Sequence, residues 1–227
     1  MQRRTFLRAS ALSAGVMPMG APIAEAEQST LRVQVLAYEG AEELDFVAPF
    51  DVLAMAGHMS NNRIRTTLVS TNKPTTITAS KGMRIEVPRG WSPQDADILV
   101  VPGGGFANRP GSGLAKLLAD KVFMRRLAAV EAVTVGVCTG VMALSAAGFT
   151  KGRSATTHAG AKADLAAQGA TVINARVVDD GDLVTCGGIT SGLDAAIWLV
   201  ERFLGPQLAT QVETVMEYER RGTVWRS

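Results

Sequence analysis

The sequence contains few residues of the kinds that usually hold metal ions or cross-link the chain. Its 227 residues include only two cysteines and two histidines, and none of them has the spacing of a zinc ligand set. A phosphate-binding loop and the G-x-G-x-x-G dinucleotide fingerprint are also absent, since the three glycines at 103–105 do not fit that pattern. We therefore expect no metal centre and no bound nucleotide.

Long apolar runs are absent from the body of the chain, which excludes a membrane-spanning helix there. The first 26 residues are different: Arg3-Arg4 is followed by Phe6-Leu7, a modestly apolar stretch over 9–23, and Ala24-Glu25-Ala26. This order is typical of a secretory signal and its cleavage site, and the paired arginines favour the twin-arginine route. We expect residues 1–26 to be removed on export, leaving a periplasmic domain of residues 27–227 with no membrane anchor. The alternative is a disordered basic tail.

The predicted mature domain has no excess of charge of either sign. The chain as a whole carries a net charge of +2. That excess lies within residues 1–26, so acidic and basic side chains are equal in number over 27–227. A neutral body has no general electrostatic attraction for nucleic acid or an anionic membrane. We therefore expect a small-molecule substrate as the partner and no nucleic acid.

Segments with strand and helix patterns alternate along the chain. The expected strands are 31–37, 64–69, 97–101, 132–137, 155–157, 171–173, 176–178 and, as the last strand, 183–186, with a hairpin over 75–87 that is broken by Gly82. The expected helices are 44–55, 114–130, 141–147, 161–168, 193–204 and 207–218. This alternation predicts an α/β fold with three layers, in which helices cover both faces of a mainly parallel sheet.

The most informative segment is Val135-Gly-Val-Cys-Thr-Gly140, which places Cys138 between a buried strand and a helix. A tight turn at this point needs small neighbours, as in a nucleophile elbow. Such a turn raises the side chain above the carboxyl ends of the strands, where α/β sheets place their sites. The N-terminus of the following helix favours a thiolate over a thiol. The alternative is a buried structural cysteine.

A glycine triplet at 103–105 follows the preceding strand. Glycines allow backbone N–H groups to approach a ligand oxygen closely. We expect Gly104 and Gly105, together with the N–H of Thr139, to form an oxyanion hole. A flexible glycine turn is the alternative.

Three further polar or sulfur-containing side chains are candidates for the same sheet edge. Asp45 lies in the loop after the first strand. Buried beside Cys138 it could be protonated and donate to the thiolate, or act as the general acid or base; the alternative is a helix N-cap. His158 follows a strand, and a catalytic and a structural role are equally compatible with its position. Cys186 ends the expected last strand, where it could line the pocket or the core. A Cys138–Cys186 disulfide would silence the elbow, and we do not expect one.

Together these segments resemble the ThiJ/PfpI superfamily, which is flavodoxin-like and related to the class I glutamine amidotransferase domain. The matching stretches are Leu44-Asp45-Phe46 with Pro49-Phe-Asp-Val-Leu53, Val101-Pro-Gly-Gly104, Gly136-Val-Cys-Thr-Gly140, Ala155-Thr-Thr-His158 and Ser191-Gly-Leu-Asp194. The resemblance covers roughly residues 31–205. The closest branch looks like isonitrile hydratase and the amidase-like domains of certain AraC-type regulators. The chain after Gly205 is long enough for only about two helices, so we do not expect DNA binding.

The resemblance implies Cys138 as nucleophile, Asp45 as its acidic partner and Thr139 as an assisting neighbour. It implies hydration of a small isonitrile to an N-substituted formamide, without a cofactor, in a homodimer. Thr139 stands where the peptidase branch has histidine, which disfavours peptidase activity. The alternatives are a non-enzymatic sensor with an oxidisable Cys138 and a glyoxalase- or deglycase-like activity.

One departure from that branch concerns the pocket. Hydratase-like sequences tend to carry a bulky aromatic after the histidine, whereas this chain has Ala159-Gly160. The two small residues predict a wider pocket beside His158.

Overall fold

A computed structural model describes residues 29–227 of the chain. Its centre is a seven-stranded sheet with the order β11-β9-β10-β6-β5-β1-β2. The strands are β1 (Leu31–Leu36), β2 (Ile64–Val69), β5 (Ile98–Val101), β6 (Val133–Val137), β9 (Val177–Asp180), β10 (Leu183–Cys186) and β11 (Trp225–Arg226). The five strands from β10 to β2 are mutually parallel, and β9 runs antiparallel to β10.

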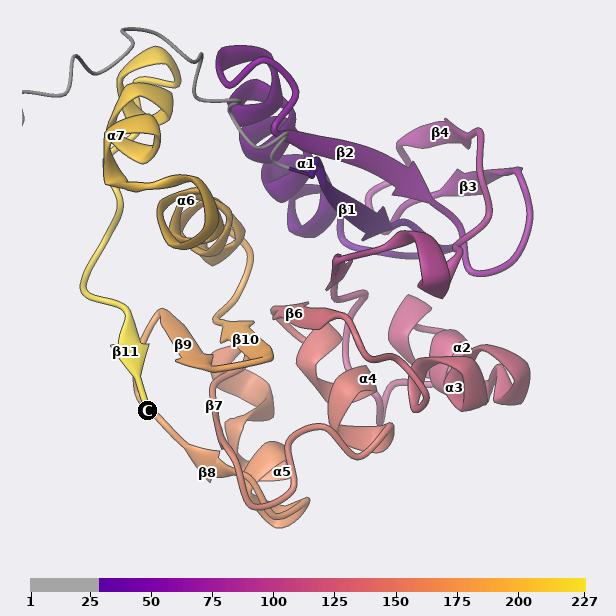
Figure 1. Cartoon of the computed structure of the whole chain (residues 1–227). Helices are drawn as coiled ribbons and strands as arrows, with labels where there is room; N and C mark the ends of the chain where they lie inside the picture. The colour runs from indigo at the N-terminus through magenta and orange to yellow at the C-terminus, as the bar shows by residue number, and fades with distance from the viewer. Residues whose placement is uncertain (1–28) are drawn as a thin grey trace, which may run out of the picture.

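Helices cover both faces of this sheet, which makes three layers (Figure 1). One layer contains α1 (Glu43–Met59), α6 (Ser191–Leu204) and α7 (Pro206–Val215), and the other contains α2 (Gly113–Ala119), α3 (Lys121–Leu127), α4 (Gly140–Ala146) and α5 (Lys162–Ala167). Because both faces are covered, β5 is buried along its whole length, as its uninterrupted apolar sequence predicts. The predicted α/β, flavodoxin-like architecture is confirmed.

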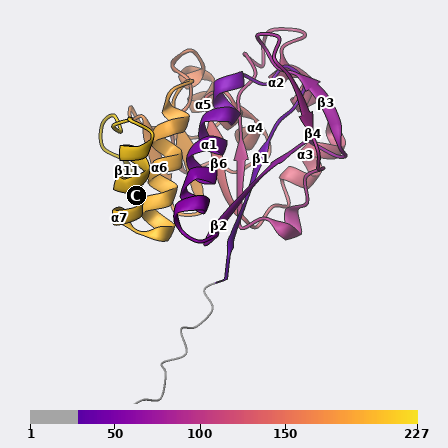
Figure 2. The same ribbon diagram turned by 90° about the horizontal axis from the view of Figure 1, so that it is seen from above.

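Two small sheets and two 3₁₀ turns complete the fold. The hairpin of β3 (Thr75–Thr78) and β4 (Arg84–Val87) lies at the opposite end of the molecule from α7 in both views (Figure 2). The second sheet pairs β7 (Ser154–Ala155) with β8 (Thr171–Val172). The 3₁₀ turns are η1 (Pro93–Asp95) and η2 (Ala159–Ala161). No helix within residues 29–227 is long and apolar enough to cross a bilayer.

Two expectations about the elements are wrong. The single helix predicted over 114–130 is two helices, because the Asp120 carboxylate caps α3 by accepting from the N–H groups of Val122 and Phe123. The strand over 183–186 is also not the last, since β11 pairs with β9 close to the C-terminus. The predicted signal sequence at 1–26 lies outside the described residues.

Candidate active site

The carboxyl ends of β1, β5, β6 and β10 bring four chain segments together at one edge of the sheet. After β1 the chain runs through a short loop into α1, which carries Asp45, and after β5 it continues into the glycines at 103–105. Cys138 follows β6 directly, and Gly187 follows β10. From β1 the chain continues to β2 on one side of β1, and from β2 it crosses to β5 on the other side. This edge therefore lies at the topological switch point of the sheet.

The expected elbow at Cys138 is present. Its φ angle is +56°, in the left-handed region that a residue with a side chain rarely adopts. Three hydrogen bonds hold this backbone: the Cys138 N–H donates to the carbonyls of Gly187 at 3.1 Å and Cys186 at 3.2 Å, and the Cys138 carbonyl accepts from Thr157 Oγ1 at 2.7 Å. A Cβ at Gly140 would lie 2.1 Å from the Val101 carbonyl oxygen, so only glycine permits this contact between α4 and β5.

The Asp45 carboxyl group is buried against the elbow. The helix starts at Glu43 with Glu42 as the N-cap residue, so Asp45 is not the cap that its position in the sequence also allowed. Its Oδ2 accepts from the N–H of Gly103 at 3.1 Å, and its Oδ1 is buried without a partner in good hydrogen-bond geometry. Burial raises the pKa of Asp45 to about 7, although the adjoining Cys138 thiol and the Gly103 N–H oppose the increase.

The ionisation of Cys138 differs from the sequence expectation of a thiolate. Burial and the charge of Asp45 raise the pKa of Cys138 to about 12, whereas the backbone N–H groups of Ile189 and Thr139 lower it. Only 6% of the residue is exposed. The N–H groups at the start of α4 favour the thiolate as predicted, but burial and the neighbouring carboxylate outweigh them. The resting sulfur is therefore a thiol beside a carboxyl group that titrates near neutral pH.

In the glycine loop over 103–105, the N–H groups of Gly103 and Gly104 already have acceptors, so they do not form the expected oxyanion hole. The Gly103 N–H donates to Asp45, and the Gly104 N–H donates to Thr139 Oγ1 at 3.3 Å. Gly105 has a φ of +84° and lies exposed where the loop leaves the site. The loop therefore orients the acid and Thr139, while the Thr139 N–H faces the thiol.

His158 does not contact Cys138 or Asp45 through any hydrogen bond in residues 29–227. Its Nδ1 accepts from the Gly160 N–H at 3.1 Å, and its ring meets the Phe106 ring edge-on at 5.4 Å between centroids. A Cβ on Gly188 would lie 2.3 Å from His158 Cδ2, so the imidazole packs on the loop after β10. These contacts indicate a structural role.

Phe106 also occupies part of the space that the small residues after His158 leave open. A Cβ on Gly160 would approach the Phe106 ring to 3.0 Å. The expected widening beside His158 is therefore offset by an aromatic ring from a different loop.

Three site residues were not identified from the sequence: Tyr38, Thr157 and Ile189. The Tyr38 hydroxyl donates to the Pro102 carbonyl at 3.0 Å, and its burial and the charge of Asp45 raise its pKa well above its usual value. Thr157 holds the carbonyl of the nucleophile, and Ile189 supplies an N–H near the sulfur. The contacts of Tyr38 and Ile189 depend on neighbouring strands, so no local pattern reveals them.

Cys186 is fully buried at the end of β10 and is not joined to Cys138, since both cysteines are free. Its carbonyl lies 3.2 Å from the Cys138 nitrogen. Its thiol is part of the core, so the expectation that the two cysteines form no disulfide is confirmed.

A cavity of about 300 Å³ lies beside Thr139. Thr139, Met142 and Ala161 are its buried lining residues, and Phe106 closes one side. Asp164 lies on its exposed rim, and none of the described lining residues is basic. No group of three or more potential metal-binding side chains occurs within residues 29–227.

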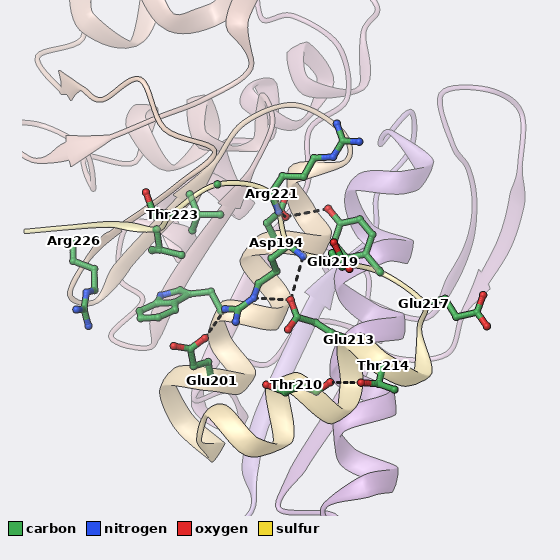
Figure 3. A pocket seen from close by; sticks show the side chains of 16 residues that line it. Asp194, Glu201, Thr210, Glu213, Thr214, Glu217, Glu219, Arg221, Thr223 and Arg226 are labelled. Atoms are coloured by element: carbon green, nitrogen blue, oxygen red, sulfur yellow. Dashed lines mark hydrogen bonds and ion pairs between the residues drawn. The ribbon is translucent and has the colours of Figure 1, made fainter.

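A second and larger hollow, of about 1200 Å³, lies between α6, α7 and the C-terminal segment (Figure 3). Neither Cys138 nor Asp45 is among the lining residues of either cavity. Thr139, which directly follows Cys138, lines the smaller cavity, so we assign the substrate site to that one.

Comparison with known proteins agrees with this geometry. The DJ-1/PfpI family pattern matches residues 31–202. The isonitrile hydratase of Pseudomonas putida is 32% identical over 192 residues, which are 83% of this chain and 78% of the hydratase. The Parkinson disease protein 7 homolog of Danio rerio is 29% identical over 189 residues, 80% of this chain and 94% of that protein. A crystal structure of a ThiJ/PfpI family protein from Pseudomonas syringae superposes with a TM-score of 0.73 at 26% identity, covering 92% of this chain and 84% of that one. The chain therefore belongs to the DJ-1/PfpI family.

Proposed function

We propose that the protein is a cofactor-independent cysteine enzyme that hydrates a small isonitrile to an N-substituted formamide. The observation that carries the proposal is the buried carboxyl group of Asp45 beside the thiol of Cys138 on a strained elbow. A group with a pKa near the working pH is well suited to accept and return a proton. The similarity to an isonitrile hydratase supports the choice of substrate.

The first step adds the thiol across the isonitrile carbon. Ionised Asp45 takes the proton from Cys138, and the sulfur lone pair forms a bond to the terminal carbon of R–N≡C. Asp45 then gives the same proton to that carbon, which leaves a thioimidate, R–N=CH–S–Cys138. The N–H groups of Thr139 and Ile189 stabilise the transient negative charge on sulfur.

The second step hydrolyses the thioimidate. Asp45 accepts a proton from water as the oxygen bonds to the carbon, and the imine nitrogen gains that proton. The resulting R–NH–CH(OH)–S–Cys138 expels the sulfur, which regains the hydroxyl proton, and R–NH–CHO leaves. Water and isonitrile are thereby consumed, and the thiol is restored.

The cavity beside Thr139 supports an uncharged, apolar substituent R. Met142, Ala161 and Phe106 offer apolar contact, and no basic side chain of the described lining is available to bind an anionic substrate. Burial of such a substituent contributes about 0.8 kcal/mol per CH₂ group.

The test uses residues 27–227 and cyclohexyl isocyanide, with N-cyclohexylformamide measured by chromatography. Wild type should form the formamide, and Cys138→Ala should form none. Cys186→Ala is the matched control, because Cys186 is the second cysteine, is fully buried and is not joined to Cys138, and it should retain turnover. Absence of formamide with the folded wild type would contradict the proposal.

One observation favours a second candidate, a peroxide sensor. Asp45 Oδ1 is buried without a partner, so a protonated Asp45 could donate to an oxidised sulfur. In this case two molecules of hydrogen peroxide oxidise the Cys138 thiol to a sulfinic acid and are themselves reduced to two molecules of water. No turnover of isonitriles, combined with a gain of two oxygens at Cys138 alone, would favour the sensor. Turnover of a dicarbonyl instead would favour the glyoxalase-like alternative.

A further inference from the structure

The turn over residues 187–190, between β10 and α6, touches the nucleophile through its backbone. The Gly187 carbonyl accepts from the Cys138 N–H at 3.1 Å. Ile189 has a φ of +43°, in the left-handed region, which is unusual for a β-branched residue. Such a conformation persists only where the surrounding structure holds it. The interactions that hold this turn therefore matter for the environment of the sulfur.

Arg176 binds the turn from both ends. Its backbone carbonyl accepts from the Gly187 N–H at 2.9 Å, and its guanidinium donates to Thr190 Oγ1 at 3.1 Å. The Nε of the same guanidinium donates to Asp194 Oδ2 at 2.8 Å. One planar side chain thus joins the end of the turn to the first turn of α6.

Asp194 is itself fixed by the C-terminal segment. It is buried, and its Oδ1 accepts from the Tyr218 hydroxyl at 3.0 Å and from the Arg221 N–H at 2.8 Å (Figure 3). Both carboxylate oxygens are therefore occupied, one by Arg176 and the other by the segment after α7. This leaves the guanidinium little freedom to move.

We propose that Arg176 is a positioning residue for Cys138, because with Asp194 it holds the strained 187–190 turn, whose Gly187 carbonyl accepts from the Cys138 N–H at 3.1 Å. Arg176 does not touch the reacting atoms. Loosening the turn frees the backbone of the elbow. The Ile189 N–H of the same turn lowers the pKa of Cys138, so displacing it raises that pKa. The effect on turnover rests on the proposed function, whereas the effect on sulfur ionisation does not.

The test is the pH dependence of Cys138 alkylation by iodoacetamide, followed by mass spectrometry. Arg176→Met should raise the apparent pKa of Cys138 and thereby slow alkylation at neutral pH about tenfold. Thr190→Val retains the Arg176–Asp194 ion pair and its charges, and should shift the pKa in the same direction by a smaller amount. In the isonitrile assay both variants should lower kcat more than they raise KM.

Arg153→Met is the matched control. Arg153 pairs with Asp180 at the opposite end of the strands, and its side chain is 27% exposed compared with 32% for Arg176. It should leave the alkylation profile unchanged. An unchanged profile in Thr190→Val would overturn the proposal even if Arg176→Met shifted it, because the cause would then be the charge of Arg176 alone. Absence of isonitrile turnover with an intact alkylation shift would refute only the proposed function.

Discussion

The buried carboxyl group of Asp45 lowers the stability of the folded protein near neutral pH. Burial raises the pKa of Asp45 from an ordinary value of 3.8 to about 7. Between these two values the unfolded chain releases its proton before the folded chain does. Stability is therefore greatest below the unfolded pKa and falls as the pH rises towards 7. This loss of stability follows from burying the carboxyl group beside the elbow.

Asp45→Asn should accordingly stabilise the protein near pH 8. The gain in free energy of unfolding is expected to be about 4 kcal/mol at that pH and to become small at about pH 3, below the ordinary pKa of 3.8, where the folded and the unfolded wild type both hold the proton. Thermal unfolding at the two pH values measures it. An equal difference at both would show that Asp45 does not titrate with a raised pKa.

At the level of single residues, the sequence predicted that Cys138 and Asp45 meet, but not that Cys138 is a thiol. Cys138 follows β6 and Asp45 follows β1, and their meeting follows from the parallel order of those strands. The thiolate expectation considered the helix N-terminus alone. The pKa of Cys138 depends also on burial and on the charge of Asp45, which only the packed structure reveals.

At the level of elements, the site depends on close contact between α4 and the strands beneath it. Gly140 permits this contact, since a Cβ there would lie 2.1 Å from the Val101 carbonyl oxygen. Backbone atoms of a central strand cannot move aside without disturbing the sheet. The position of α4 and of the elbow before it therefore requires glycine at position 140.

Gly140→Ala should destabilise the fold by about 3 kcal/mol or more. Gly192→Ala in α6 is the control, because a Cβ there meets only the side chains of Pro49, Val137 and Ala48, at ordinary distances of at least 3.4 Å. That control should be neutral or should gain about 0.5–1 kcal/mol from helix propensity. Urea unfolding compares the two variants, and equal stabilities would contradict the packing argument.

Local patterns identified the main elements but missed features that depend on distant partners. The strand over 64–69 has the predicted bounds. The helix break at Asp120 was missed, because the apolar spacing continues through it. β11 is two residues long and exists only by pairing with β9, so its own sequence carries little signal.

At the level of the whole molecule, the sheet order explains why one edge carries the chemistry. Crossovers on both sides of β1 leave the loops after β1, β5, β6 and β10 facing one another. The C-terminal segment then reaches back to bind Asp194, so residues far apart in sequence support one site. We also propose, on the resemblance, that the protein functions as a homodimer.

We further propose that the chain is exported by the twin-arginine route and cleaved after Ala26. The family match begins at residue 31, so cleavage should leave the matched domain intact. N-terminal sequencing of the periplasmic protein should begin at Glu27. Recovery of the uncleaved chain from wild-type periplasm would refute the expected cleavage.

Replacing Arg3 and Arg4 with lysines tests the export route, and should retain the protein in the cytoplasm.

The most direct test of the central claim compares two rates at Cys138 in Asp45→Asn. Because the charge of Asp45 raises the pKa of Cys138, its removal should make the sulfur more acidic and speed its alkylation by iodoacetamide. The same change removes the group that carries the proton, so isonitrile turnover should be lost. Faster alkylation with lost turnover is the predicted result. Slower alkylation, or turnover at the wild-type rate, would contradict a shared role of this thiol and this carboxyl group.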